Sequence, residues 1–485
     1  MNLSSLPSSI TQLANLCTLH LDKCLLKDIA IIGELKDLEI LSLQRATIEE
    51  LPEEIKQLTK LRSLNLSKTK IKAIPPNLLS SLSRLEQLYL CESFVEWEVD
   101  GGKNACLVEL KDLSCLTTLE FQIRETNIIP KDLFHERLER FKILIGEAWK
   151  WYGLSIPRTL KLKLNTRLLQ DRGIKMLLKK SEALYLNLDE LEGVKSLLYE
   201  LDHEGFPNLK YLHVKSGSNI EYIIHSKQWI ISKAFPVLES LFLQNLTNLK
   251  KICNGQLPPE SFSRLKNVKV ASCKKLKNLF SFSEARVLLQ LEEIEVNDCE
   301  NVTEIISEEK AIDDSEAMDK LVFRQLRSLR LQSLPQLICF CSREVHPKTS
   351  STRSTSDKSS CCSEILDDNE ATNKSVSSLS RSLRLQSLSK LCFCCREVSY
   401  IETTSTSSRD MTLLNQKILF PSKDFTSFHC IQNLTSLVIR DCNSPQHLFS
   451  VSVATTLMQL KFLEINKCEM MRAILVTEET GASHI

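Results

Sequence analysis

One hydrophobic pattern recurs along the whole chain. Leucine or another apolar residue stands at the first, fourth and sixth positions of L-x-x-L-x-L, and mostly polar residues fill the positions between them. Clear copies occupy residues 16–21, 38–43, 61–66, 85–90, 116–121, 209–214, 238–243, 265–270, 291–296, 326–331, 434–439 and 460–465. Weaker copies lie at 141–143, 160–162, 184–186 and 383–385. The copies are mostly roughly 22 to 31 residues apart, so each one marks a repeat of the same structural unit.

The alternating part of each copy predicts a short strand. Its leucines should point inward and its intervening residues outward. One repeat cannot bury its own leucines, so neighbouring repeats must stack, with their strands paired in parallel. The pattern therefore predicts an α/β leucine-rich-repeat solenoid, a curved horseshoe of about 16 irregular repeats with a parallel β-sheet on its concave face.

Small residues in the turn after each strand are expected to satisfy backbone groups. We assign this turn position to Cys24, Thr47, Thr69, Cys273, Cys299, Cys442 and Cys468. Because these residues fall on successive turns without clustering, a metal site is not expected among them. In a long chain, reduced cysteines that pack as small apolar residues are the expected state.

The repeats change character along the chain. We expect regular repeats over 1–120, irregular repeats over 121–205, with a strand at 158–164 and a helix at 172–182, and longer repeats over 206–345. Segment 346–378 is rich in Ser, Thr and charge and predicts a disordered loop. Duplicated and terminal repeats follow over 379–485, with a similar loop near 399–412.

The chain is expected to open in the middle of a repeat. Residues 3–10 read L-S-S-L-P-S-S-I and match I-E-E-L-P-E-E-I at 48–55 position by position. This match indicates the second half of a repeat whose strand would lie upstream of Met1.

Charge and hydropathy indicate neither a nucleic-acid partner nor a transmembrane segment. Lys and Arg number 62 against 61 Asp and Glu, so electrostatics gives no reason to expect nucleic acid. No run of 18 apolar residues predicts a transmembrane segment.

Enzyme chemistry finds no support in the motifs. Gly101-Gly102-Lys103 is the nearest approach to a phosphate loop, but it lacks the earlier glycine and the following Ser or Thr. The nine histidines are scattered. We therefore predict no enzyme and no catalytic, cofactor-binding or metal-binding residues.

A binding surface is the remaining prediction. The outward positions include His20, Asp22, Ser42, Gln44, Asn65, Tyr89, Glu92, Tyr185, Tyr211, His213, Phe242, Gln244, Lys269, Glu295, Arg330 and Glu464. From this ladder and from the insertions we select as protein-binding candidates His20, Gln44, Asn65, Tyr89, Glu92, Trp97, Trp149, Trp151, Tyr211, Phe242 and Arg330. Exposed aromatic and arginine side chains are favoured anchors of protein interfaces.

Several longer phrases carry a family resemblance. The early repeats read L-x-x-L-x-L-x-x-[CT]-x-I-x-x-L-P, and residues 275–285 read K-L-K-N-L-F-S-F-S-x-A. Residues 291–306 read L-x-x-I-x-V-x-D-C-E-x-V-x-E-I-I, and 448–454 repeat the L-F-S theme. Together they resemble the C-terminal repeat region of plant coiled-coil nucleotide-binding leucine-rich-repeat (NB-LRR) disease resistance proteins.

The resemblance implies a role in plant defence and innate immunity. Such a region belongs to a cytoplasmic receptor, where it restrains the nucleotide-binding domain of the same protein and senses a pathogen effector or a guarded host protein that an effector has modified. ADP or ATP would bind only the nucleotide-binding domain, which this chain lacks. Two alternatives stay open, the substrate-receptor arm of a ubiquitin ligase and a truncated, non-functional fragment. A third, an extracellular receptor ectodomain, is disfavoured by the low glycine count.

Overall fold

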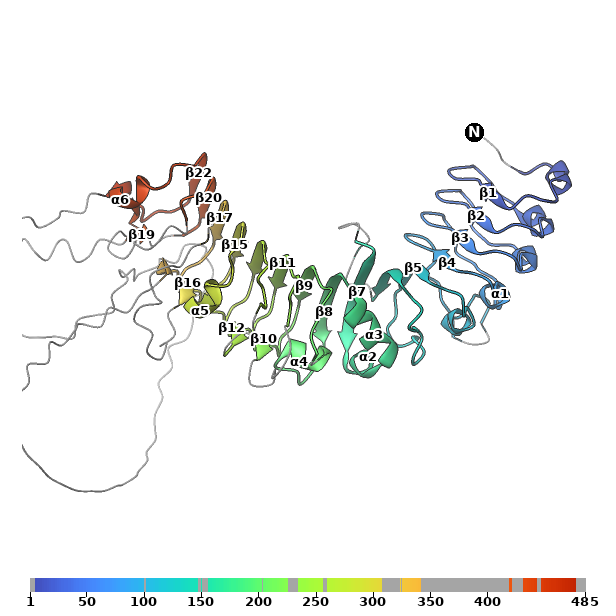
Figure 1. Cartoon of the computed structure of the whole chain (residues 1–485), viewed down its shortest axis with the longest axis horizontal. Coiled ribbons are helices and arrows are strands. Elements are labelled where there is room, and N and C mark those ends of the chain that lie inside the picture. Colours follow the sequence, from blue (N-terminus) through green and yellow to red (C-terminus); the bar gives the residue numbers. More distant parts are fainter. Residues whose placement is uncertain are drawn as a thin grey trace, which may run out of the picture.

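A single parallel sheet runs the length of the molecule. The computed structural model describes residues 5–99, 102–146, 150, 156–202, 204–225, 234–255, 260–307, 323, 325–341, 418–420, 431–442 and 446–476. The sheet has 15 strands, and they follow one another in chain order. Figure 1 shows them side by side along the inner side of an arc.

The strands of this concave sheet coincide with the repeated pattern. They are β1 (Thr18–His20), β2 (Ile40–Ser42), β3 (Ser63–Asn65), β4 (Gln87–Tyr89), β5 (Thr118–Ile123), β6 (Arg140–Ile145), β7 (Arg158–Asn165), β8 (Ala183–Glu190), β9 (Tyr211–Lys215), β11 (Ser240–Gln244), β13 (Asn267–Ala271), β15 (Glu293–Asn297), β17 (Ser328–Gln332), β20 (Ser436–Arg440) and β22 (Phe462–Asn466). Each strand falls in one predicted copy, and the copy at 383–385 lies outside the described residues. The predicted solenoid is confirmed.

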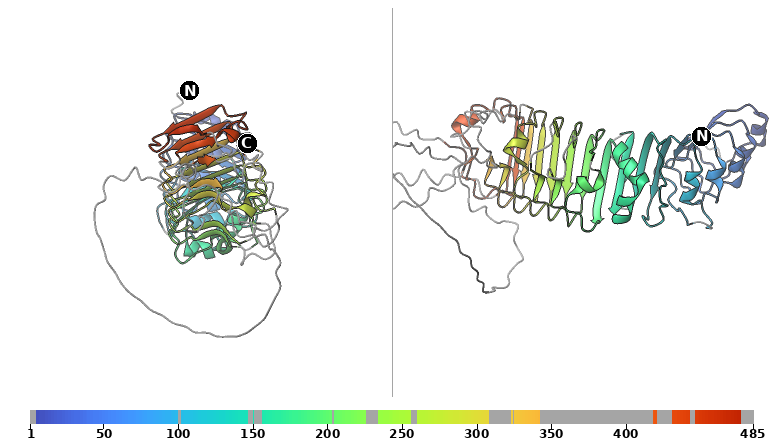
Figure 2. Two further views of the ribbon diagram at one scale, coloured as in Figure 1. Left: turned by 90° about the vertical axis from the view of Figure 1, so that its left-hand side faces the viewer. Right: turned by 60° about the horizontal axis from the view of Figure 1, so that its bottom comes forward.

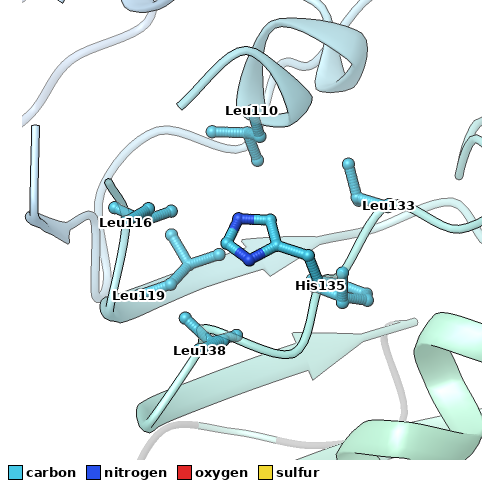
Figure 3. Close-up of a pocket in the computed structure, with 7 residues that line it drawn as sticks. Leu110, Leu116, Leu119, Leu133, His135 and Leu138 are labelled. Carbon is cyan, nitrogen blue, oxygen red and sulfur yellow. The ribbon is translucent and has the colours of Figure 1, made fainter. Parts of the chain in front are cut away.

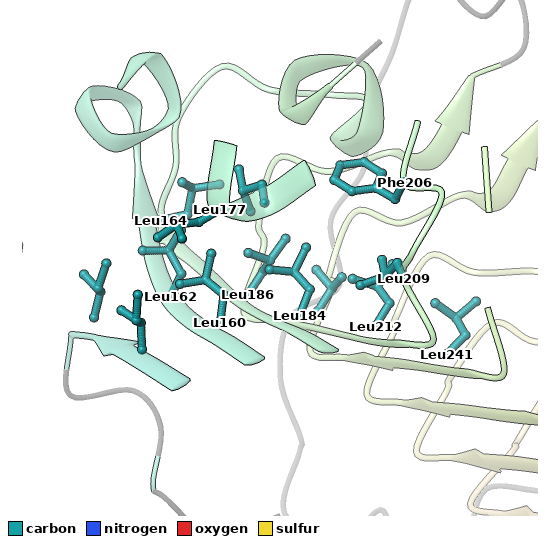
Figure 4. Close-up of a cluster of buried hydrophobic side chains, with 14 of the residues drawn as sticks. Leu160, Leu162, Leu164, Leu177, Leu184, Leu186, Phe206, Leu209, Leu212 and Leu241 are labelled. Carbon is teal, nitrogen blue, oxygen red and sulfur yellow. The ribbon is translucent and has the colours of Figure 1, made fainter. Parts of the chain in front are cut away.

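The register of the concave strands places the buried leucine of each strand opposite the buried leucine of the next. Leu41 of β2 pairs with Leu19 of β1 and with Leu64 of β3. A slip of one residue would turn every buried leucine toward solvent, so the register is strongly fixed. Figure 4 shows inward leucines of β7, β8 and later strands, among them Leu160, Leu184 and Leu212, stacked into one continuous core.

The early repeats return along the convex side through short helical turns. These are η1 (Ser8–Gln12), η2 (Ala30–Glu34), η3 (Glu53–Gln57), α1 (Leu78–Ser81) and η4 (Leu107–Lys111). Pro7 and Pro52 precede η1 and η3 in nearly the same extended conformation. The described part of the first phrase, residues 5–10, therefore has the same structure as its counterpart at 50–55.

The middle of the chain returns through α-helices. They are α2 (Thr166–Gln170), α3 (Arg172–Lys180) and α4 (Leu197–Leu201). Of these, α3 has nine residues and the other two have five each. The helix expected over 172–182 is α3, and the strand expected over 158–164 is β7. Asn165 and Asp171 cap α2 and α3 by accepting hydrogen bonds from Leu168 N and Ile174 N.

The later repeats return through strands, which the sequence reading did not anticipate. These form three small parallel sheets, built from β10 (Tyr222–His225) and β12 (Lys251–Asn254); β14 (Phe280–Ser281), β16 (Glu304–Ser307) and β18 (Cys339–Cys341); and β19 (Ile418–Phe420), β21 (His447–Ser450) and β23 (Ala473–Val476). The L-F-S phrases give β14 and β21. Each phrase ends in a serine, Ser281 or Ser450, that caps a short helix, α5 (Phe282–Ala285) or α6 (Val451–Ala454).

Phenylalanines form a spine inside the later repeats. Phe206, Phe235 and Phe262 stack with ring centroids 6.0 and 5.5 Å apart, and all three are fully buried. Each ring closes the turn that leads into the next strand.

The turn after most concave strands contains a residue in the left-handed conformation. Its φ lies between 50° and 60° at Lys23, Arg45, Lys68, Glu92, Ser216, Asn245, Ser272, Asp298, Ser333, Asp441 and Lys467. The next residue is small at most of these turns, as at Cys24 and Thr69, but it is Leu246 after Asn245 and Leu334 after Ser333. The five assigned cysteine thiols each donate to the carbonyl two residues earlier, at 3.2–3.7 Å. Thr69 donates to Leu66 O at 2.7 Å.

Thr47 is wrong as a member of this turn position. The pairing of Leu41 with Leu19 and Leu64 places Ala46, not Thr47, at the position of Cys24 and Thr69. Ala46 is buried and its N–H bonds Leu43 O, as the equivalent N–H groups do. Thr47 instead donates to Leu26 O of the preceding repeat.

A charge ladder follows the edge where the concave strands begin. Backbone hydrogen bonds join its members in sequence from Glu39 to Glu139 and from Arg158 to Lys461, whereas between these two stretches the register shifts and Arg158 pairs with Phe141. The members are Glu39, Arg62, Glu86, Thr117, Glu139, Arg158, Glu182, Lys210, Glu239, Lys266, Glu292, Arg327, Thr435 and Lys461. Acid and base alternate along most of it. Arg62 lies 3.6 Å from Glu39 and 2.9 Å from Glu86, while Glu182 lies 2.8 Å from both Arg158 and Lys210.

Candidate functional site

The concave face divides into three zones along the solenoid. The first zone belongs to β1–β4 and is polar. His20, Asn65 and Tyr89 lie in one row of paired positions on this face. Gln44 and Glu92 sit in the turns beyond the strands.

Several side chains of this first zone already contact their own or the neighbouring repeat. Asp22 accepts hydrogen bonds from the Ser42 hydroxyl and from Gln44 N. The Asn65 amide oxygen accepts from Ser67 N at 3.0 Å, and Glu92 forms an ion pair with Lys68 at 3.5 Å. The zone therefore presents polar side chains that are already hydrogen-bonded or ion-paired.

The second zone is a central patch of four rings on β8, β9 and β11, namely Tyr185, Tyr211, His213 and Phe242. Tyr211 lies 4.9 Å from Tyr185 and 5.0 Å from Phe242, measured between ring centroids. His213 lies 5.9 Å from Tyr185 and 5.8 Å from Phe242. Tyr211, His213 and Phe242 are partly exposed, and Tyr185 is buried beneath them.

Lysines lie at both ends of the central patch. Lys161 Nζ is 4.4 Å from the centroid of the Tyr185 ring, and Lys269 Nζ is 5.7 Å from that of Phe242. Such geometry is that of cation–π contacts. Lys161 is 5% exposed and donates to the carbonyl of Lys150 at 2.8 Å.

Burial shifts the titration of the groups in this zone. Burial is the main cause that lowers the pKa of His213 to about 4; a hydrogen bond with Gln244 opposes the shift, and the charges of Lys215 and Lys161 add to it. Burial also lowers the pKa of Lys161 and of Lys215 and raises the pKa of Tyr211. At neutral pH His213 is therefore an uncharged hydrogen-bonding ring.

The third zone is a hollow of about 220 Å³ on β15, β17, β20 and β22, lined by Glu295, Asn297, Arg330, Leu331, Gln332, Val438, Arg440, Phe462 and Glu464. Arg440 binds Glu464 through two hydrogen bonds of 2.7 and 2.8 Å. Arg330 is exposed between them and Glu295, and its charge helps to lower the pKa of both carboxylates. We call this feature the C-terminal hollow.

The structure places some of the predicted protein-binding residues on the concave face. Tyr211, Phe242 and Arg330 lie on the concave face as expected, the first two in the central patch. Tyr185 and His213 complete that patch but were not selected. They stand in the same outward row, and their alignment across strands was the signal that a position-by-position choice missed.

Trp97 is wrong as a surface anchor. It is 6% exposed, packs edge-on against Phe94 and Phe121 at 4.9 and 5.8 Å, and donates its indole N–H to Gln122 O. The insertion that carries it folds back on the core because the indole can bury its rings and still satisfy its one donor. Trp149 and Trp151 lie outside the described residues.

A second enclosed space lies inside the core near β5. It measures about 10 Å³ and is lined by Leu110, Leu116, Leu119, Leu133, Phe134, His135 and Leu138. Figure 3 shows the imidazole of His135 among the leucine side chains. Burial lowers its pKa. The space is at most the size of one water molecule, so no ligand can bind there.

Few of the described side chains are suited to metal binding or to nucleophilic chemistry. No group of three His, Cys, Asp or Glu side chains in the described ranges could hold a metal ion. Burial raises the pKa of Cys91 and of Cys442 to about 12, so these thiols stay protonated at neutral pH. None of the helices that the structure describes has the length and apolar character needed to cross a membrane.

Family models match the repeats in two parts. Residues 178–300, 237–354 and 413–469 match "Plant disease resistance protein RPS2-like, leucine-rich repeats", and residues 36–91 match a general leucine-rich-repeat model.

Curated relatives point in the same direction. A disease resistance protein of Arabidopsis thaliana is 26% identical over 70% of this chain and 35% of its own length. A probable disease resistance protein of the same plant is 28% identical over 54% of this chain and 29% of its own. The chain thus spans about a third of the length of these relatives.

Solved structures share only the general repeat architecture. A leucine-rich-repeat protein of Leptospira interrogans aligns with 20% identity and a TM-score of 0.38, covering 71% of this chain and 88% of that one. The functional domain of InlJ from Listeria monocytogenes aligns with 16% identity and a TM-score of 0.39, covering 68% of this chain and 69% of that one. The solenoid is defined by its own parallel sheet rather than by these superpositions.

Proposed function

Because this chain belongs to the leucine-rich-repeat regions of plant disease resistance proteins, we propose that it is the protein-recognition and autoinhibitory arm of an immune receptor in the cytoplasm. In this role it binds other proteins and catalyses no reaction. Its partners are the nucleotide-binding domain of the same receptor and either a pathogen effector or a guarded host protein.

The observation that carries this proposal is the central patch. Four adjacent rings, three of them partly exposed, lie on a rigid sheet between lysines. Aromatic side chains with restricted rotamers lose little entropy when a partner covers them, which is why they anchor protein interfaces. The sheet beneath holds them in place before any partner arrives.

The two roles fall on different repeats. The polar surface of residues 10–100 is regular, and this suits a stable contact with another domain of the same chain. The central patch and the C-terminal hollow offer shaped, chemically distinct sites for a second protein. A ligand shifts such a receptor only by binding the open state more tightly than the closed state.

An exchange of segments between full-length receptors tests this division. Residues 10–100 or residues 206–341 are replaced by those of a close relative with different specificity, and cell death is scored in leaves with and without the recognised protein. We expect exchange of 10–100 to release activity without a ligand and exchange of 206–341 to change which protein is recognised. If both exchanges alter both properties together, the division is wrong.

A further inference from the structure

The charges around the central patch favour one kind of partner. Lys161 and Lys215 are both close enough to His213 to lower the pKa of its imidazole. Lys269 borders the Phe242 end of the patch. The patch is therefore enclosed by three ammonium groups carried on β7, β9 and β13.

The carboxylates of this region are already bound to lysines. Lys163 lies 2.7 Å from Glu190 and 3.9 Å from Asp189, and Lys269 lies 3.0 Å from Glu295. Burial lowers the pKa of Lys215, and the charge of Asp189 opposes this shift. The ammonium groups that lie against the rings themselves are those of Lys161, over Tyr185, and Lys269, near Phe242.

This arrangement discriminates against cations. Aromatic rings attract a cationic ligand when nothing else occupies their faces. Here Lys161 already lies over the Tyr185 ring and Lys269 near that of Phe242, so a second cation would meet like charge at short range. A carboxylate, in contrast, would gain from ammonium groups whose water has partly been removed by burial.

The exposed ring faces favour contact with an apolar side chain of the partner. Tyr211 and Phe242 present neighbouring, tilted faces 5.0 Å apart, and His213 beside them is neutral and can exchange a hydrogen bond. An aromatic or branched aliphatic residue that covers these faces would bury apolar area on both sides of the interface.

We propose that the central patch binds an acidic protein segment in which an aromatic or large aliphatic side chain is flanked by aspartate or glutamate. The apolar side chain covers Tyr211 and Phe242, and the carboxylates lie toward Lys215, which is partly exposed on the same strand as His213. This inference rests on the proposed recognition function and specifies the chemistry of the partner at that site.

Three labelled peptides test it by fluorescence anisotropy against the full chain. Each has about twelve residues, enough in extended form to span the patch. The first places one Trp among Glu and Ser residues, the second replaces every Glu by Lys, and the third replaces the Trp by Ser. We expect the first to bind at least about tenfold more tightly than either of the others. Its affinity should fall as salt is raised.

Matched variants locate the binding. Lys215→Glu should weaken the acidic peptide about tenfold, whereas Lys27→Glu makes the same charge change on an exposed residue of an early repeat and should have no effect. Phe242→Ser should abolish binding, whereas Tyr199→Ser removes an exposed aromatic ring of α4, outside the concave sheet, and should leave it intact. Circular dichroism confirms that each variant is folded.

The outcomes separate this inference from the proposed function. Equal binding of acidic and basic peptides, no binding of the acidic peptide at about 1 mM, or unchanged binding by Phe242→Ser overturns the acidic partner. If Phe242→Ser nevertheless removes recognition in leaves, the proposed function stands without it. If the peptides behave as expected and recognition in leaves is unaffected, the patch binds acidic segments but is not the recognition site.

Discussion

The early repeats and the later repeats share a concave strand but return to it through different structures. From β1 to β4 the return is a short helical turn such as η2 or η3, whereas from β9 onward it is a strand, and these strands pair within three small parallel sheets. Paired strands are about 4.8 Å apart, while helical elements need more room. A helical return therefore spreads the convex side and forces curvature, and a strand return does not.

The overall shape follows this difference. In the right-hand view of Figure 2 the green and yellow repeats form a nearly straight stack, and the blue repeats turn away from it. The central patch lies on the straight part, where neighbouring side chains stay parallel and ring faces can align. The type of return element thus decides where on the concave face an ordered aromatic patch can form.

The largest expected effect comes from the phenylalanine spine, which exists only where strands form the return. Phe235→Ala should lower the free energy of unfolding by about 3–5 kcal/mol, because it leaves a cavity between Phe206 and Phe262. Hydrogen exchange should show faster opening of β9–β13 and unchanged protection of β1–β4, since repeats stabilise only their neighbours. Equal loss of protection in both regions would contradict the comparison.

A buried carboxylate, that of Glu109, lies on η4, the last of the short helical turns. Glu109 is 4% exposed and accepts hydrogen bonds from the backbone N–H groups of Asn77, Leu79 and Cys106 at 3.0–3.1 Å. Glu109→Ala leaves three donors without their acceptor, so denaturant unfolding should show a loss of about 1–3 kcal/mol. Glu54→Gln, at an exposed position on η3, is the control and should change nothing measurable.

The charge ladder predicts a pH dependence. Burial alone would raise the pKa of Glu182, but hydrogen bonds and charge from Lys210 and Arg158 outweigh it, and the pKa falls below its usual 4.5. A carboxyl whose pKa is lowered by folding stabilises the protein above the unfolded pKa, and this stabilisation is lost as pH falls through the folded pKa. Glu182→Gln should therefore cost about 1 kcal/mol at pH 7.

The same variant should lose its difference from the parent below pH 4.5, as melting temperatures at several pH values would show. A difference that persists undiminished at acid pH would mean that lost packing, not lost charge, causes the effect.

The smallest effect concerns the left-handed turn residues, which differ between the two regions. The early repeats place long side chains there, Lys23, Arg45 and Lys68, whereas later repeats use Asn245 and Asp298. Asparagine and aspartate tolerate this conformation better than other residues. Arg45→Asn should stabilise by about 0.5–1 kcal/mol and Asn245→Arg should destabilise by the same amount. Thermal melts of the two variants should shift in opposite directions.

The sequence predicts the concave face far better than the convex one. The spacing of leucines sets the strands because a buried side chain at every second position admits only one register. The return segments carry no comparable alternation, and Ile223 and Ile224 or Ile305 and Ile306 read as short apolar runs whose strand character depends on pairing with the next repeat. The sequence likewise does not reveal that Trp97 is buried, because its burial depends on packing against Phe94 and Phe121, which belong to two different repeats.

The central patch could be predicted in part. Tyr211 and Phe242 stand at outward positions of adjacent copies, which is visible in the sequence. The contribution of Lys161 is not visible in the sequence, because the register of the concave sheet shifts between β6 and β7. There Lys161 pairs with Leu144 and not with Lys142. Only the paired strands show which lysine lies beside Tyr185.

The charge ladder has a consequence for how such a chain can gain or lose repeats. Acid and base alternate from one repeat to the next, so removal or insertion of a single repeat brings two like charges together, whereas a change by two repeats preserves the order. Where a charge is missing from this alternation, a threonine takes its place, Thr117 between Glu86 and Glu139 and Thr435 between Arg327 and Lys461, and the order of acid and base beyond it is unchanged. The ladder therefore acts as a parity rule, under which repeats are added or removed in pairs.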